Sequence, residues 1–327
     1  MFNAIVLRKK ETQTVSLEQL EDNFISDNEV FIDIEYSNLN YKDCLAITNK
    51  SPIARSYPLI PGIDFAGIVK GSSVKEFKVG DKVVLNGFGV GEKISGGLSQ
   101  KASAKAEWLL KLPDNLSTFE AMAIGTAGYT AMLAVMEIEA KNYDKNDAEI
   151  IVTGVGGGVG GIAVSLLASL GYKVIGATSR IENSDYIKYL GAHKVITYAS
   201  LLENTKPLLK ENWLAGIDVL GGSVLDRICS ATKYGGTVVV CGLADNIKLN
   251  TTVFPFILRG ISIIGIDSVY CPMQRRMDAW EKLSQLINRD HLKTITSTIS
   301  LKEVIDTAKL IIDRKIKGRI VIDTSST

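Results

Sequence analysis

A glycine-rich segment carries the clearest chemistry in this chain. "EIIVTGVGGGVGGIAVSLLASLG" occupies residues 149–171, with glycines at a G-x-x-G-x-x-G spacing and, in a second register, at a G-x-G-x-x-G spacing. In either register one glycine makes a sharp turn, one lets backbone approach a pyrophosphate, and one lets a helix pack on a strand. The helix N-terminus adds unpaired N–H groups and a positive dipole end. We therefore predict a dinucleotide site at Gly154, Gly157, Gly158, Val159 and Gly160.

Two alternatives to this site have to be weighed. Residues 150–172 carry no charge and could cross a bilayer, which takes about 20 apolar residues. They also hold seven glycines, which suit a helix interior poorly. A glycine-rich loop without a ligand is the second alternative. A strand before the turn and a helix after it favour the dinucleotide site.

The end of the following strand, "YKVIGATSRIEN", indicates which dinucleotide binds. NAD sites usually place an acidic residue there for the ribose hydroxyls, whereas this chain has Thr178, Ser179 and Arg180. Arg180 would attract a 2′-phosphate through charge-assisted hydrogen bonds, and Ser179 can donate another. Glu182 is an acidic competitor nearby, and Arg180 could instead be a solvated residue at a helix start. The pattern predicts NADPH as the cofactor.

A second group of reactive side chains lies in "NLNYKD", where Asn40, Tyr41, Lys42 and Asp43 are adjacent. An amide, a hydroxyl and a carboxyl group could serve a reaction as oxyanion donor, polar anchor and acid. The same residues also suit a helix start, with Asn40 as N-cap and Asp43 near the positive end of the helix. An ordinary Asp is ionised at neutral pH, which disfavours it as an acid. The residue types leave both interpretations open.

The order of expected strands and helices predicts two kinds of domain around these residues. Strands expected at 193–198, 216–222, 235–242 and 261–267 alternate with helices, which predicts an α/β chain with a doubly wound parallel sheet. The first 120 residues show short strands and frequent turns, as in a small β-barrel. Helices near 273–288 and 301–314 and a strand at "GRIVID" follow the sheet. We expect a substrate domain of residues 1–122 and 270–327 and a nucleotide domain of residues 123–269.

Composition limits the kind of protein. The chain has 46% hydrophobic and 22% charged residues and a net charge of +1, which argues against nucleic-acid or anionic-membrane binding. The four cysteines form no C-x-x-C pair and are typical of reduced thiols in the cytosol. The apolar run in "MFNAIVLRKKE" is too short for a signal peptide. We expect a cytoplasmic protein with no membrane partner.

Several motifs together resemble a known family. "PGIDFAG" (61–67), "VGDKV" (79–83) and "GTAGYTA" (125–131) are similar to motifs of the medium-chain dehydrogenase/reductase superfamily. "NYKD" (40–43), "CGLA" (241–244), "PFILRGISIIGIDSV" (255–269) and "KGR" (317–319) resemble one branch of it, the NADPH-dependent acrylyl-CoA reductases. The resemblance covers essentially the whole chain. It implies a GroES-like β-barrel domain and a Rossmann domain.

The resemblance also implies roles for particular residues. Tyr41 would lie beside the nicotinamide and position it or stabilise an enolate. The resemblance also favours the functional interpretation of this segment, in which the amide of Asn40 is an oxyanion donor and Asp43 is a weaker candidate for a general acid. Leu243, Ile257 and Ser268 would contact the cofactor. Tyr198 replaces a basic residue on the adenosine-phosphate side, which weakens the expected preference for NADPH.

No metal is expected in this chain. Zinc members of the superfamily carry a catalytic Cys and a "GHE" motif, where this chain has "GID" at 62–64. Cys44 and Asp64 alone are too few for a zinc ion, which takes three or four protein ligands. We expect Cys44 to be a small buried residue. A chain without zinc ligands suits hydride transfer to an activated C=C bond better than alcohol oxidation.

The predicted function is NADPH-dependent reduction of a short enoyl-CoA, acryloyl-CoA first. NADPH:quinone oxidoreduction is one alternative, and an NADPH-binding protein with a structural or regulatory role is another. Lys42, Arg275 and Arg276 are candidates for the CoA phosphates, although a solvated helix face is the favoured interpretation of these residues. The resemblance further implies a homodimer, which an edge strand near "GISIIGID" (260–267) could join.

Overall fold

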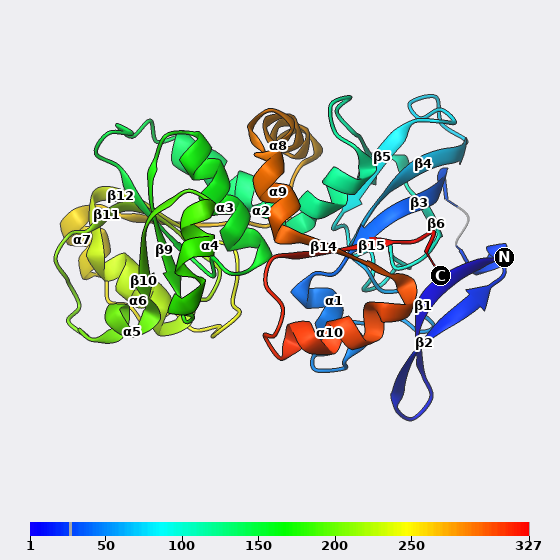
Figure 1. Ribbon diagram of the computed structural model, residues 1–327, viewed down its shortest axis with the longest axis horizontal. Coiled ribbons are helices and arrows are strands. Elements are labelled where there is room, and N and C mark those ends of the chain that lie inside the picture. Colours follow the sequence, from blue (N-terminus) through cyan, green and yellow to red (C-terminus); the bar gives the residue numbers. More distant parts are fainter. Residues whose placement is uncertain (26–27, 327) are drawn as a thin grey trace. The chain divides into compact units, whose positions relative to one another are not determined.

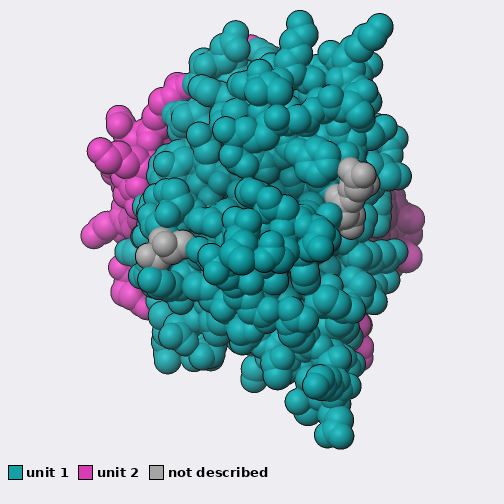
Figure 2. Space-filling view, turned by 90° about the vertical axis from the view of Figure 1, so that its right-hand side faces the viewer, with its two compact units in different colours: residues 1–126, 268–284, 296–327 teal, residues 127–267, 285–295 magenta. Residues whose placement is uncertain are grey.

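The computed structural model describes residues 1–25 and 28–326 and divides into two compact units (Figure 2). Unit 1 contains residues 1–126, 268–284 and 296–327, and unit 2 contains residues 127–267 and 285–295. These ranges differ from the expected domains chiefly at 285–295. That stretch folds with unit 2 because its helix α9 (Arg289–Ile295) packs on α3 (Gly158–Ser169), where Ser165 Oγ and His291 Nδ1 lie 2.8 Å apart.

Unit 2 is built on a six-stranded sheet in the order β10-β9-β8-β11-β12-β13, in which all neighbours are parallel (Figure 1). Numbered from β8, this order is 3-2-1-4-5-6, as in a doubly wound dinucleotide-binding sheet. The predicted sheet is therefore present. Its strands are β8 (Glu149–Thr153), β9 (Lys173–Thr178), β10 (Ala192–Thr197), β11 (Trp213–Asp218), β12 (Thr232–Val240) and β13 (Ser262–Gly265).

Local sequence explains the central strand and its helix. Ile150, Ile151 and Val152 of β8 have no exposed surface, as expected for a parallel strand covered on both faces. Gly171 ends α3 with φ +89°, and the N–H of Tyr172 donates to the carbonyl of Leu167, which satisfies the last helical carbonyls. The other helices of unit 2 are α4 (Ser184–Tyr189), α5 (Tyr198–Leu202), α6 (Gly222–Ala231) and α7 (Phe254–Arg259).

Unit 1 contains a seven-stranded sheet in the order β14-β15-β3-β4-β5-β7, with β6 paired to β3, and a two-stranded sheet β1-β2. The pairs β3–β4, β4–β5 and β5–β7 are antiparallel, which agrees with the predicted barrel of short strands. These strands are β1 (Phe2–Lys9), β2 (Gln13–Leu20), β3 (Val30–Asn38), β4 (Asp64–Ser72), β5 (Lys82–Asn86), β6 (Lys101–Ala104), β7 (Leu110–Lys111), β14 (Thr296–Ser300) and β15 (Arg319–Asp323).

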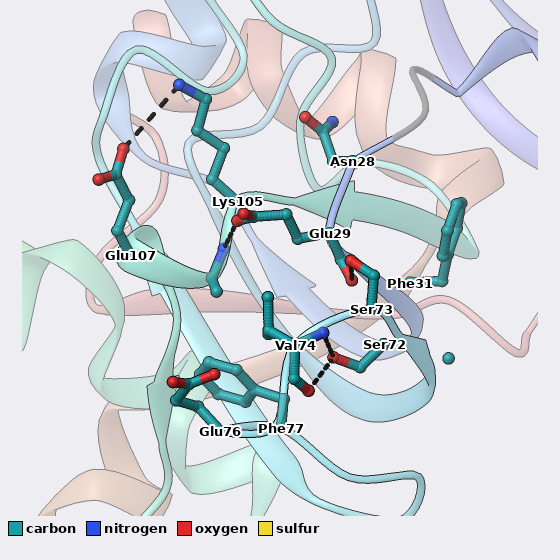
Figure 3. A pocket seen from close by; sticks show the side chains of 12 residues that line it. Asn28, Glu29, Phe31, Ser72, Ser73, Val74, Glu76, Phe77, Lys105 and Glu107 are labelled. Atoms are coloured by element: carbon teal, nitrogen blue, oxygen red, sulfur yellow. Dashed lines mark hydrogen bonds and ion pairs between the residues drawn. The ribbon is translucent and has the colours of Figure 1, made fainter.

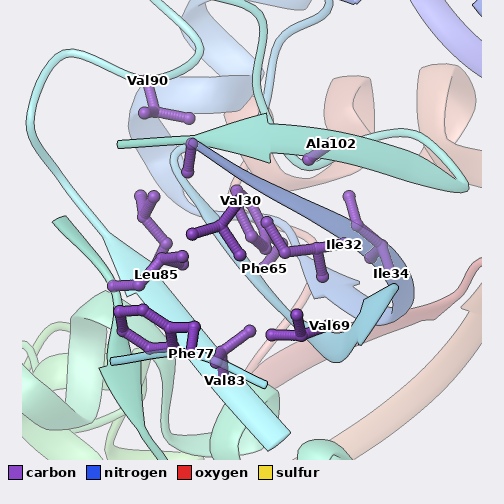
Figure 4. Close-up of a cluster of buried hydrophobic side chains, with 12 residues drawn as sticks. Val30, Ile32, Ile34, Phe65, Val69, Phe77, Val83, Leu85, Val90 and Ala102 are labelled. Atoms are coloured by element: carbon purple, nitrogen blue, oxygen red, sulfur yellow. The ribbon is translucent and has the colours of Figure 1, made fainter. Parts of the chain in front are cut away.

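Apolar side chains from β3, β4, β5 and β6 form a buried cluster in unit 1 (Figure 4). Val30, Ile32 and Ile34 alternate along β3 and are at most 5% exposed, and Phe65 from β4 is 1% exposed. Alternation directs one face of β3 to this cluster. Burial of each such side chain contributes about 1.5–3 kcal/mol.

The helices of unit 1 follow the predicted pattern at most places. They are α1 (Tyr41–Ile47), α8 (Met273–Leu286), α10 (Val304–Ile312) and the first part of α2 (Thr118–Glu139). Before α2, Ser117 and Glu120 form a capping box, in which each side chain accepts a hydrogen bond from the other residue's backbone N–H.

Among the residues that the structure describes, α2 is long enough and apolar enough to cross a membrane. However, 83% of its apolar window is buried inside the protein, as in the core helices of soluble proteins that pass the same test. The segment suspected of spanning a membrane, 150–172, instead forms β8, the glycine turn and α3.

Candidate active site

The glycine turn joins β8 to α3 in unit 2, and its glycines have separate tasks. Gly154 has φ +63°, and a Cβ there would lie 2.3 Å from a methyl carbon of Val219. A Cβ on Gly160 would lie 2.5 Å from the carbonyl oxygen of Gly154, so Gly160 lets the helix approach the strand. A Cβ on Gly156 would meet nothing within 4 Å, so backbone is open to a ligand there.

Helix α3 begins without a side-chain cap, because its N-cap residue is Gly157. The first N–H groups of a helix have no partner within the helix, and in α3 these belong to Gly158, Val159 and Gly160. Uncapped N–H groups beside open glycine backbone fit a pyrophosphate. The residues therefore fit the dinucleotide that the sequence predicts.

Further predicted contacts lie at the same edge of the sheet. Thr178 ends β9, is 6% exposed, and accepts a hydrogen bond from the N–H of Arg180 (3.0 Å). Thr178 pairs with Thr197, which precedes Tyr198, and the Tyr198 hydroxyl accepts a hydrogen bond from the N–H of Gly154 (2.9 Å). The structure thus brings Gly154, Thr178 and Tyr198 together. Ser179 is exposed and Arg180 half-buried.

The end of β11 is tied to the glycine turn by a residue that sequence reasoning missed. Asp218 is fully buried and accepts hydrogen bonds from Thr153 Oγ1 (2.8 Å) and the N–H of Gly221 (2.7 Å). Thr153 Oγ1 in turn accepts one from the N–H of Val219 (2.9 Å). Burial raises the pKa of Asp218. Its position at a strand end was the available signal.

Leu243 and Ile257 lie in the segment after β12 and are highly exposed, at 64% and 68%. The loop that holds Leu243 is joined to the loop after β11, since the N–H of Ala244 donates to the carbonyl of Val219 (3.1 Å). Ser268 belongs to unit 1, where its carbonyl accepts a hydrogen bond from Arg276 (3.2 Å).

Unit 1 contains a buried polar cluster centred on Asp64. This carboxylate has no exposed surface and accepts hydrogen bonds from the side-chain amides of Asn38 (2.9 Å), Asn40 (2.9 Å) and Asn86 (2.8 Å). The backbone N–H of Thr126 (2.7 Å) and the Thr126 hydroxyl also donate to it. These five donors satisfy the hydrogen-bonding capacity of the buried Asp64 carboxylate.

Arg319 supplies positive charge to the same cluster. It is 4% exposed and donates to the carbonyl of Ala123 (3.0 Å) and to Asn40 Oδ1 (3.3 Å). Sequence reasoning weighed Asp64 only as a metal ligand and noted "KGR" only as a family motif, and it missed that Asp64 and Arg319 converge. A charged residue at the first position of an apolar strand was the signal in both cases.

The kink in α2 belongs to this cluster. Gly125 has φ +52°, and a Cβ there would lie 2.3 Å from Asn38 Nδ2, 2.5 Å from Arg319 Nη2 and 2.9 Å from Asp64 Oδ2. Only glycine lets the backbone come this close. The kink is what directs the Thr126 N–H at Asp64.

Asn40 and Asp43 form the capping box of α1. Asn40 donates both amide hydrogens, to Asn38 Oδ1 (2.7 Å) and Asp64 Oδ2 (2.9 Å), so its amide has no donor left for an oxyanion. Asp43 is 2% exposed and accepts from the N–H groups of Asn40 and Ile63 (both 2.9 Å). The helix-start interpretation accounts for the bond between Asp43 and the Asn40 N–H. The Asp64 cluster uses both amide hydrogens of Asn40, so the oxyanion role expected for Asn40 is not available in this arrangement.

The acidity of Asp43 differs from the sequence expectation. Burial, with a smaller contribution from the nearby charge of Asp64, raises the pKa of Asp43 to about 7. An ordinary Asp would be ionised at neutral pH, whereas this one exchanges its proton near neutrality. Its enclosure among backbone N–H groups separates it from the surface.

Tyr41 is the accessible member of the "NYKD" segment. It begins α1 and is 46% exposed. The neighbouring Lys42 forms an ion pair with Glu92, whose side chain is 13% exposed. Lys42 is therefore held at the start of α1 by a carboxylate.

The position of Arg276 differs from both interpretations made from the sequence, a contact to CoA phosphates and a solvated helix face. It is 1% exposed, so it lies neither on a solvated helix face nor where a CoA phosphate could reach it. It donates to the carbonyl of Asn86 (2.8 Å), and its guanidinium carbon lies 4.5 Å from the ring centre of Phe88. Arg276 holds the loop after β5 against residues 268–269.

Cys44 is fully buried in an apolar cluster of unit 1, as expected for a small packed residue, and burial raises the pKa of its thiol. Among the described ranges 1–25 and 28–326, the structure has no group of three or more His, Cys, Asp or Glu side chains that could hold a metal ion.

An open cavity of about 1180 Å³ lies elsewhere on unit 1 (Figure 3). Its wall includes Phe31, Phe77 and Glu29, and the Glu29 carboxylate accepts a hydrogen bond from the N–H of Ala106 (2.8 Å). None of the predicted site residues lines it. We therefore do not place the reaction there.

A small β-barrel combined with a doubly wound sheet that carries a glycine turn is the architecture of a nucleotide-dependent dehydrogenase or reductase. Two family models match the chain, "Alcohol dehydrogenase GroES-like domain" at residues 26–114 and "Zinc-binding dehydrogenase" at residues 158–309.

Individual relatives are similar over their whole length. The acrylyl-CoA reductase AcuI of Ruegeria pomeroyi is 42% identical, with 100% of both chains covered. The structure of Escherichia coli YhdH with bound NADPH is 41% identical, covers 98% of this chain and 99% of that one, and has a TM-score of 0.95. Bacillus subtilis YhfP with bound NAD is 41% identical, covers 99% of each chain and has a TM-score of 0.94.

The chain belongs to the medium-chain dehydrogenase/reductase superfamily, in the zinc-independent branch that includes the acrylyl-CoA reductase AcuI. The predicted family and fold class are thereby confirmed.

Proposed function

We propose that this chain is an NADPH-dependent reductase of activated C=C bonds that converts acryloyl-CoA to propanoyl-CoA. The observation that carries the proposal is the 42% identity to AcuI over the entire chain. The open glycine turn and uncapped α3 support the cofactor part of it. The predicted roles of the site residues are part of this proposal.

NADPH supplies a hydride when it is bound. That hydride would reduce the β-carbon of the enoyl thioester, and a proton from solvent would complete the saturated product at the α-carbon. In unit 2, Gly156, Gly157 and the first N–H groups of α3 hold the pyrophosphate. Ser179 and Arg180 hold the 2′-phosphate through donors and positive charge.

Unit 1 contributes a rigid base for Tyr41. The capping box of α1 and the Lys42–Glu92 ion pair fix the start of the helix on which Tyr41 stands. We propose that the Tyr41 hydroxyl positions the cofactor or stabilises the enolate. Asn40 and Asp43 act through this helix start.

The proposed activity is tested by following NADPH consumption in parallel assays with acryloyl-CoA and with an ortho-quinone. NADH and a chelator serve as controls. We expect rapid, chelator-insensitive oxidation with acryloyl-CoA and identification of propanoyl-CoA as product. Turnover with the quinone alone would contradict this and favour the second function. Binding of NADPH without turnover on either acceptor would indicate a structural or regulatory protein.

NADPH:quinone oxidoreduction is the second candidate. The observation that favours it is the relative YhfP, whose name designates a quinone oxidoreductase and which is 41% identical over 325 residues. We further propose that the protein is cytoplasmic, because its four cysteines are free thiols. We also propose a homodimer, because β13 lies at the edge of the sheet and exposed apolar residues such as Val253 and Leu258 lie in the segment before it.

A further inference from the structure

Tyr198 makes a long-range contact to the first glycine of the turn. Its hydroxyl accepts a hydrogen bond from the N–H of Gly154 (2.9 Å), although the two residues are 44 apart in sequence. Gly154 follows β8 and Tyr198 follows β10, and β9 lies between these strands. Neighbouring strands are about 4.8 Å apart, so this side chain crosses the carboxyl end of β9.

Gly154 determines where the rest of the turn lies. Its carbonyl accepts a hydrogen bond from the N–H of Gly157 (2.8 Å) and lies directly against Gly160. Its α-carbon lies against the side chain of Val219. A displacement of Gly154 would therefore move the start of α3 and its N–H groups.

The ring of Tyr198 is well placed to fix this glycine. It packs against the apolar cluster of unit 2 that includes Leu201 and Trp213. A ring held by packing keeps its hydroxyl in one position, and a fixed acceptor restricts the N–H that donates to it.

We propose that Tyr198 is a positioning residue of the cofactor site, which sets the geometry of the glycine turn through Gly154. This inference rests on the proposed cofactor function. The turn holds the pyrophosphate, which NADPH and NADH share, whereas the 2′-phosphate is found in NADPH alone. Tyr198 therefore affects the binding of both cofactors equally and does not distinguish between them.

The test is Tyr198→Phe, which keeps the ring and removes the acceptor. We expect the dissociation constants of NADPH and NADH to rise by the same factor, about fivefold, the effect of one ordinary hydrogen bond. Their ratio should stay within about twofold of the wild-type value. Hydrogen exchange of the Gly154 amide in the cofactor-free protein should become faster.

Two variants serve as comparisons. Tyr234→Phe removes a hydroxyl from a tyrosine that is 75% exposed in the same unit, and it should change neither affinity nor exchange. Arg180→Glu should weaken the binding of NADPH and not that of NADH, as expected for a residue that contacts the 2′-phosphate.

Three results bear on the inference. If Tyr198→Phe raises the dissociation constant of NADPH and leaves that of NADH unchanged, Tyr198 contacts the 2′-phosphate directly and the inference is wrong. Unchanged affinity and exchange would also overturn it. If the wild-type protein binds neither nucleotide, the proposed function fails, and the exchange rate of the Gly154 amide still shows whether Tyr198 restrains the turn.

Discussion

Arg180 follows the strand end at which a dinucleotide sheet selects its cofactor. Replacing it with glutamate puts a negative charge where the 2′-phosphate is expected. We expect the Michaelis constant for NADPH to rise about 10- to 100-fold, as for the loss of a charged hydrogen bond, and that for NADH to change little. Steady-state kinetics with both cofactors measures this. Lys188→Glu, at an exposed position on α4, is the control for a general charge effect, and equal losses with both cofactors would remove Arg180 from the phosphate site.

Tyr41 offers a test of chemistry as distinct from binding. Tyr41→Phe removes only the hydroxyl of a side chain that is 46% exposed, so the fold should be unaffected. We expect kcat to fall about tenfold or more if the hydroxyl stabilises developing charge, with little change in NADPH affinity. Single-turnover kinetics and cofactor titration separate the two. Normal turnover would show that the hydroxyl has no chemical role.

Asp43 predicts a pH dependence of stability. Its pKa is raised to about 7 in the fold from an unfolded value of about 3.9, so the unfolded state loses its proton first. The contribution of Asp43 is therefore fully present below pH ~4 and is lost as the pH rises through about 7. In Asp43→Asn this titration is absent.

Urea unfolding of the wild type and Asp43→Asn at several pH values measures the difference. The stability advantage of the wild type should shrink between pH ~4 and ~7. Asp306→Asn, which alters an exposed carboxylate paired with Lys309, should show no such trend. A constant difference across this range would mean that the proton of Asp43 is not released near neutrality.

Helix α2 depends on Gly125 at its kink. Gly125→Ala would force a Cβ against three polar atoms of the Asp64 cluster at a φ that side chains disfavour. We expect a loss of about 3 kcal/mol or more in the free energy of unfolding. Thermal unfolding tests this against Gly71→Ala on β4, where the new Cβ would make only ordinary contacts at 3.9 Å. Equal stability of the two variants would be the contrary result.

The elements also show how far sequence reasoning extends. The glycine turn and α3 could be predicted because their signals are local in sequence. The start of α1 could not be interpreted from sequence, since capping and catalysis use the same residue types. The structure shows that Asn40 and Asp43 cap the helix. The Asp64–Arg319 cluster was missed because it joins residues that are 255 positions apart. Arg276 was misjudged because its burial depends on a loop far away in sequence.

At the scale of the whole molecule, the proposed homodimer is open to a direct test. An exposed strand edge with an apolar neighbourhood favours pairing with a second copy. A lysine at Ile264 on β13 should weaken such pairing and shift the protein from dimer to monomer in light scattering coupled to gel filtration. Lys248→Glu, in the exposed segment before β13, is the comparison. A monomeric wild-type protein would contradict the proposal.

The division of the chain into units has a consequence for the order of folding during synthesis. Unit 2 needs no residue beyond 295, whereas unit 1 needs residues 296–327. A nascent chain that ends at 295 can thus complete its nucleotide-binding half, and domains generally fold as units as they emerge from the ribosome. Its other half still lacks β15 as a partner for β3 and Arg319 as a counter-charge for Asp64. In unit 1, the buried carboxylate of Asp64 therefore gains its counter-charge only after residues 296–327 have been synthesised.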